Sequence, residues 1–95
     1  MDSPTRQDLM GQANRLKPAV QIGRLGLNPR AVEQVRRVLA GTELVKVRIN
    51  ADSGLQVEQT GRDLAQQAGA TFVGRVGSVA VLHRPPGPDG TEESG

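Results

Sequence analysis

The residues best suited to chemistry cluster in one short turn near the N-terminus. Gly23-Arg24-Leu25-Gly26 follows an alternating apolar stretch and precedes Asn28-Pro29, a pair that favours the start of a helix. Glycines leave backbone N–H groups uncovered and let a bulky partner approach, because they have no Cβ. A helix N-terminus adds partial positive charge and free donors. With Lys17, Arg24 and Arg30 nearby, the turn is suited to holding the backbone of a polyanion.

The same turn has a plainer interpretation, in which its glycines serve only a tight strand-to-helix turn that needs positive φ. An anion-binding turn must instead be exposed and free of surrounding acidic side chains. The two interpretations therefore differ in what the structure should contain.

Further cations extend this patch along the neighbouring elements. Arg37 follows Arg30 by two helical turns, so both lie on one side of a helix. Lys46 and Arg48 alternate with apolar residues and share one strand face. The candidate binding residues are Lys17, Gly23, Arg24, Leu25, Gly26, Asn28, Arg30, Arg37, Lys46 and Arg48.

Catalytic and metal-binding patterns are missing from the chain. It has no cysteine, and His83 is its one histidine, which makes a metal site very improbable. No Ser-His-Asp set is apparent, and the turn lacks the third glycine of a dinucleotide fingerprint and the Lys-Ser/Thr of a Walker loop. We therefore expect no catalytic residues, no metal and no cofactor.

Hydrophobic periodicity and turn residues predict three helices and four strands. The order is α-β-α-β-α-β-β, an α/β single domain with a mixed four-stranded sheet packed on helices. Strand–helix–strand crossovers predict parallel pairs, and the Gly77-Ser78 turn predicts an antiparallel hairpin. The helices are expected over about residues 6–15, from Asn28 to a stop at Gly41, and over 54–68; the strands over 19–22, 44–49, 71–76 and 79–84.

Charge is distributed unevenly along the 95 residues, whose net charge is only +2. Residues 15–84 hold eleven Lys and Arg against five Asp and Glu, whereas the tail from Pro85 is acidic. A basic folded region of this kind is typical of nucleic-acid binders. Phe72 is the one aromatic residue, so contacts must use phosphates, sugars and shape, with arginine planes as the stacking surfaces.

Nothing in the chain predicts a membrane segment or a signal peptide. This absence favours the cytoplasm. The low apolar content, 36%, favours a monomer.

Several short segments follow one another in a recognisable order: Leu16-Lys17-Pro18, Gly23-Arg24-Leu25-Gly26, residues 43–49, Ala68-Gly69-Ala70, Val76-Gly77 and residues 81–85. Together they resemble the CRM domain (chloroplast RNA splicing and ribosome maturation), in particular its single-domain bacterial, YhbY-like members. The family pattern often has Lys where Arg24 stands, a basic residue where Ser78 stands and Tyr where His83 stands. The resemblance covers about residues 6–85, between N-terminal residues 1–5 and an acidic tail, 86–95, that are both expected to be disordered.

The resemblance implies an RNA-binding module with a fold similar to the C-terminal domain of translation initiation factor three. Bacterial relatives are associated with precursors of the large ribosomal subunit, and plant relatives with several such domains assist intron splicing. We therefore expect a ribosome assembly factor that binds ribosomal RNA of pre-large-subunit particles, with no small-molecule substrate.

Two alternatives stay open. The chain would be a protein-interaction adaptor if its basic face bound an acidic partner on the ribosome or in the translation machinery. A double-stranded DNA binder is disfavoured, because no helix carries Asn, Gln and Arg at base-reading spacing.

Overall fold

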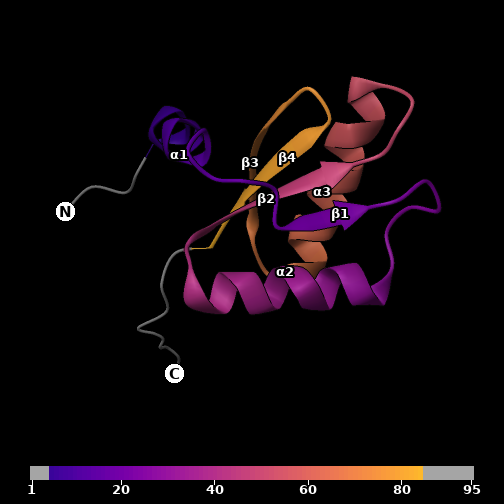
Figure 1. The fold of residues 1–95 in the computed structure, drawn as a ribbon, viewed down its shortest axis with the longest axis horizontal. Helices are drawn as coiled ribbons and strands as arrows, with labels where there is room; N and C mark the ends of the chain where they lie inside the picture. The colour runs from indigo at the N-terminus through magenta and orange to yellow at the C-terminus, as the bar shows by residue number, and fades with distance from the viewer. Residues whose placement is uncertain (1–4, 85–95) are drawn as a thin grey trace.

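Three helices and four strands alternate along the chain in the predicted order (Figure 1). This computed structural model describes residues 5–84. Of the segments predicted to be disordered, residues 1–4 and 86–95 lie outside it, whereas Thr5, predicted as part of the N-terminal segment 1–5, is ordered as the N-cap of the first helix. The α/β class and the element order are confirmed. The helices are α1 (Arg6–Ala13), α2 (Pro29–Gly41) and α3 (Gly54–Ala68); the strands are β1 (Val20–Ile22), β2 (Leu44–Ile49), β3 (Thr71–Val76) and β4 (Val79–His83).

The four strands form one mixed sheet in the order β1-β2-β4-β3. β1 and β2 pair in parallel, as predicted, with Gln21 opposite Arg48. The crossover from β2 through α3 to β3 was predicted to give a second parallel pair, but these two strands are not neighbours. β4 lies between them and pairs antiparallel with both. β4 suits this central place: four consecutive residues, from Ala80 to His83, are buried, and an inner strand covered on both faces needs such a run.

The main core lies between one face of the sheet and the helices α2 and α3. Val45, Val47 and Ile49 point into it from β2, which confirms the alternation predicted for this strand. The packing of α3 is close: a Cβ on Gly61 would lie 2.8 Å from Cε1 of Phe72. Glycine here serves helix–sheet contact, as expected.

α1 covers only part of the opposite face. Leu9 and Ala13 pack there against Leu44, Val73 and Val81 of three strands. The remainder of that face stays open around β1 and the end of β2, where Gln21 and Arg48 are exposed. α1 is held at its start by Arg6, whose Nε donates to the Val73 carbonyl at 2.6 Å.

Helix ends differ slightly from the predictions. α1 ends at Ala13, not near residue 15, because the chain turns there through a bond from Arg15 N–H to the Gln12 carbonyl. α2 continues through Gly41, which does not stop it; Thr42 is the C-cap and its hydroxyl donates to the Val38 carbonyl.

Candidate nucleic-acid interface

The glycine turn is an exposed loop between β1 and α2, at the carboxyl end of β1 (Figure 1). Leu25 at its tip is fully exposed, and Gly26 N–H donates to the Gly23 carbonyl at 3.0 Å. Gly26 has a φ of 90°, so the turn itself requires a glycine there. Gly23 has no such φ, and a Cβ added to it would meet nothing within 4 Å. The plainer interpretation therefore explains Gly26 but not Gly23.

Arg24 is exposed but does not stand alone. One of its terminal nitrogens lies 2.9 Å from Oδ1 of Asp52, with the side chains 71% and 81% exposed. One acidic side chain therefore lies at the turn, contrary to the condition set for an anion-binding turn, and a phosphate must displace it to bind Arg24. Exposed pairs of this kind contribute only about 0–1 kcal/mol, so a phosphate can exchange with the carboxylate.

Asp52 comes from the connection between β2 and α3, which is well anchored. Its backbone N–H donates to Oε1 of Gln56 at 3.2 Å, and the Ser53 hydroxyl caps α3. The backbone N–H of Asn50 donates to the Ile22 carbonyl at 2.9 Å and ties this connection to the end of β1. Sequence reasoning did not identify Asp52 as part of the site. The signal was present, because the carboxyl ends of adjacent parallel strands meet at one edge of a sheet.

The start of α2 supplies the next part of the site. Oδ1 of Asn28 accepts from the Ala31 N–H at 2.9 Å, so this side chain caps the helix, as predicted. Arg30 is exposed in the first turn, where a cation is unfavourable for the helix dipole. Arg37 lies further along and pairs with Glu33 at 3.6 Å.

The remaining candidate cations lie on the open part of the sheet. Arg48 is exposed on β2, and Lys17 is exposed just before β1. Lys46 is half-buried, and its Nζ donates to the Leu16 carbonyl at 3.0 Å. Among residues 5–84, no carboxylate lies within 4.0 Å of the charged atoms of Lys17, Arg30 or Arg48.

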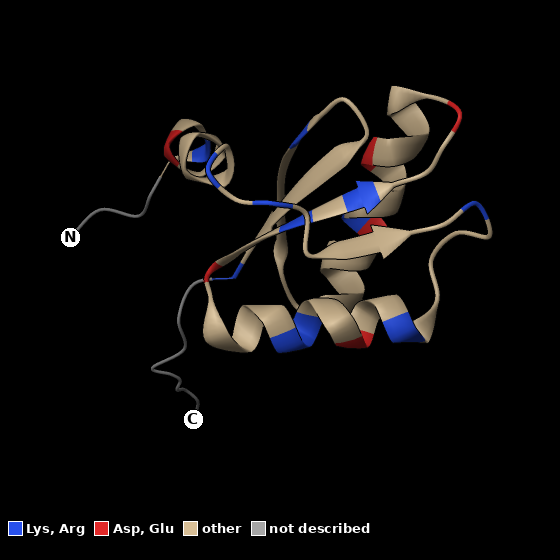
Figure 2. Ribbon diagram, in the orientation of Figure 1, with Lys and Arg blue, Asp and Glu red and all other residues tan. Residues whose placement is uncertain are grey.

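The candidate residues thus form two groups with β1 between them. The first, the loop group, comprises the turn and α2; the second, the sheet group, comprises Lys17, Lys46 and Arg48 on the face that α1 leaves open. Figure 2 shows the basic segments of the loop, α2 and β2 around β1. The arrangement offers charge and uncovered amides to a polyanion on both sides of an edge strand.

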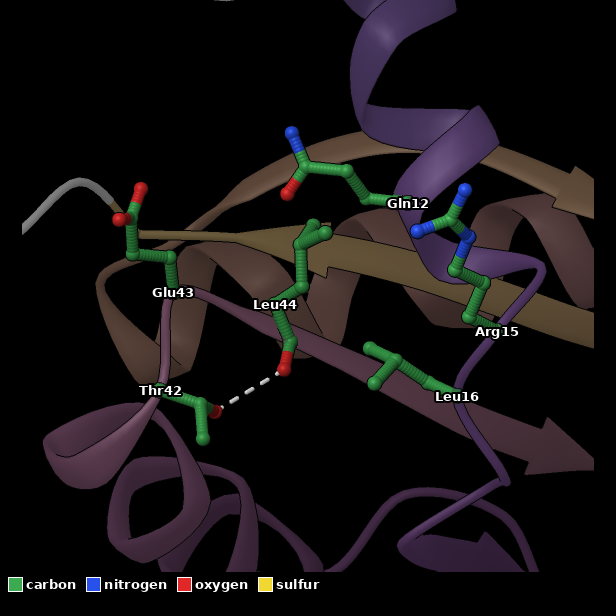
Figure 3. Close-up of a pocket in the computed structure, with 6 residues that line it drawn as sticks. All are labelled: Gln12, Arg15, Leu16, Thr42, Glu43 and Leu44. Carbon is green, nitrogen blue, oxygen red and sulfur yellow. Dashed lines mark hydrogen bonds between the residues drawn. The ribbon is translucent and has the colours of Figure 1, made fainter.

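Other parts of the described structure offer less for such a ligand. A hollow of about 400 Å³ lies between the end of α1 and the α2–β2 connection, with Arg15 and Glu43 on opposite sides of it (Figure 3). Gln12, Leu16, Thr42 and Leu44 complete its walls. None of the candidate residues lines it. His83 is buried, with Nε2 3.4 Å from Oε1 of Glu43, which fits a structural role.

Over residues 5–84, no three His, Cys, Asp or Glu side chains gather as a metal site would require. In the same part of the chain, no helix has the length and apolar composition needed to cross a membrane.

The family model of the CRS1 / YhbY (CRM) domain matches residues 1–84. The fold is similar to the solution structure of the hypothetical protein SAV1595 from Staphylococcus aureus, for which RNA binding has been suggested. The two chains are 23% identical, with a TM-score of 0.79 over 99% of this chain and 95% of the other.

Proposed function

Because this chain belongs to the CRS1/YhbY (CRM) domain family, we propose that it is an RNA-binding protein without enzymatic activity. Its ligand is ribosomal RNA of the large-subunit precursor, on which it acts as an assembly factor. The loop group holds the sugar-phosphate backbone, and the sheet group extends the contact.

Gly23 is the single observation that carries this proposal. Neither its backbone conformation nor its surroundings in the fold call for a glycine. A glycine there still has one physical effect, which is to leave the backbone bare for a close approach from outside. The exposed Arg24 beside it supplies the charge that a phosphate would meet.

The electrostatics of the site support a backbone contact more than base recognition. Phosphate contacts fix position and dominate affinity but carry no sequence information. Arginine planes and amides are what this chain offers in place of exposed aromatic platforms, since Phe72 is its one aromatic residue and packs against the core. We therefore expect the loop group to bind many RNA sequences with similar affinity.

The test is binding of large-subunit precursor RNA to the full chain and to three variants. Arg24→Glu should weaken binding to all sequences alike, by about tenfold or more at low salt, while the melting temperature stays nearly unchanged. Gly23→Ala should weaken binding with no loss of stability, because its new methyl group lies in open space. Arg15→Glu, the same charge change in the turn after α1 and outside both groups, should have a smaller effect. Unchanged affinity of Arg24→Glu would refute the loop assignment.

A ribonuclease step separates this proposal from the adaptor alternative. Complexes recovered with the full chain should dissociate when RNA is digested. Complexes that persist after digestion would favour an acidic protein partner for the same basic face.

A further inference from the structure

A shallow groove runs along β1 on the part of the sheet that α1 leaves open. It measures about 420 Å³ and is lined by Lys17, Pro18, Ala19, Val20, Gln21 and Arg48. Sequence reasoning named both of its cations but not the groove or Gln21. The alternation of Gln21 with the buried Val20 and Ile22 places its side chain on this open face.

The charge of this groove sets it apart from two other hollows of similar size. The hollow between α1 and the α2–β2 connection contains Arg15 with Glu43, and one beside α1 contains Arg15 with Asp8. The groove along β1 is lined by Lys17 and Arg48 without a carboxylate. Over the described residues, neither cation has an acidic partner within 4.0 Å. Its walls therefore complement an anion.

Gln21 adds the capacity to recognise more than charge. The register of the parallel pair sets it directly opposite Arg48, so the amide and the guanidinium are neighbours across the strands. A glutamine amide both donates and accepts, which matches the polar edge of a nucleobase. A guanidinium plane can stack on the face of the same base.

We propose that this groove holds one unpaired nucleotide of the bound RNA. The inference rests on the proposed function, and it names what the sheet group contacts. Lys17 binds the phosphate, Arg48 stacks on the base over the Pro18 ring, and the amide of Gln21 hydrogen-bonds to the base edge. A base within a duplex presents neither its face nor its pairing edge, so the nucleotide must be unpaired.

The groove lies close to the glycine loop along the chain. Gln21 precedes Gly23 by two residues, a distance of about 7 Å along an extended strand. A strand of RNA can therefore enter the groove with one nucleotide and meet the loop with a neighbouring one. Affinity comes from the loop and its cations, and preference for an unpaired base comes from the groove.

The test compares two hairpin RNAs that differ by one unpaired nucleotide in the stem, with binding measured by fluorescence anisotropy. The full chain should bind the bulged hairpin at least about fivefold more tightly than the fully paired one. Gln21→Ala should remove most of that preference without changing the net charge. Gln66→Ala, a matched control on the exposed side of α3, should retain it. Arg48→Lys keeps the charge but loses the plane, so it should lower the preference more than the affinity for the paired hairpin.

The outcomes separate this inference from the proposed function. Equal affinity of the full chain for the two hairpins, or a preference that survives both Gln21→Ala and Arg48→Lys, overturns the groove assignment. Arg24→Glu should weaken binding to both hairpins equally, and that result supports the loop whatever happens at the groove. Failure of the full chain to bind either hairpin overturns both.

Discussion

At the scale of single residues, Asp52 has the largest influence on how the loop can bind. The backbone of Asp52 is held in an anchored connection, whereas the loop that carries Arg24 has one internal backbone bond between its glycines. In the free protein the carboxylate therefore occupies one edge of the guanidinium. A phosphate approaching Arg24 meets this negative charge, so Asp52 competes with the ligand.

Substitution of this competitor should strengthen binding. We expect Asp52→Asn to raise affinity for RNA by about two- to fivefold, the range of an exposed ion pair. Asp63→Asn is the matched control, because it removes the same charge from an exposed position of α3 where the carboxylate contacts only Gln59. In an Arg24→Gln background, Asp52→Asn and Asp63→Asn should change the affinity for RNA by the same factor. An Asp52→Asn effect that persists in full without Arg24 would contradict the competition.

At the scale of elements, the end of β1, the loop and the start of α2 act as one unit. Asn28 belongs both to the candidate site and to the helix, and its oxygen is already engaged by the Ala31 N–H. Its contribution to binding is therefore indirect, since it fixes the first turn that presents Arg30.

Substitutions of Asn28 should separate its two roles. Asn28→Ala should lower the free energy of unfolding by about 1 kcal/mol, because the cap is lost, as measured by chemical denaturation. Asn28→Ser should restore most of this stability through its hydroxyl. RNA affinity should follow the same order. If Asn28→Ser regained stability but not affinity, the amide would contact the RNA itself.

Local signals predicted most of this architecture. The bounds of β2, α3 and β3 agree with the predictions to the residue, because strand alternation and a helix-ending glycine, Gly69, act within a few residues of the chain. Contacts between distant segments were not predicted. The insertion of β4 into the centre of the sheet, the partial cover by α1 and the approach of Asp52 to Arg24 depend on tertiary packing.

At the scale of the whole molecule, the two groups of cations lie on either side of β1, so the salt dependence of binding reports how much of this surface the RNA covers. Each neutralised phosphate adds about 0.7–0.9 to the slope of log affinity against log salt. If all six candidate cations contact phosphates, the slope should be about −4 to −5. A slope of only about −2 to −3 would limit the contact to about three cations, the number that either group holds. The slope is measured by determining the RNA affinity at a series of monovalent salt concentrations.

The outer strands of the sheet have a further consequence. β1 is three residues long and follows Pro18, and β3 contains an irregular register between Phe72 and Gly74. Edge strands that are short, flanked by proline or bulged are poor templates for the addition of a strand from another copy of the chain. The positive charges of Lys17 and Arg24, which lie on either side of β1, also repel the same edge strand of a second copy. The same cations that would attract an anionic polymer therefore help to keep the chain from polymerising with itself.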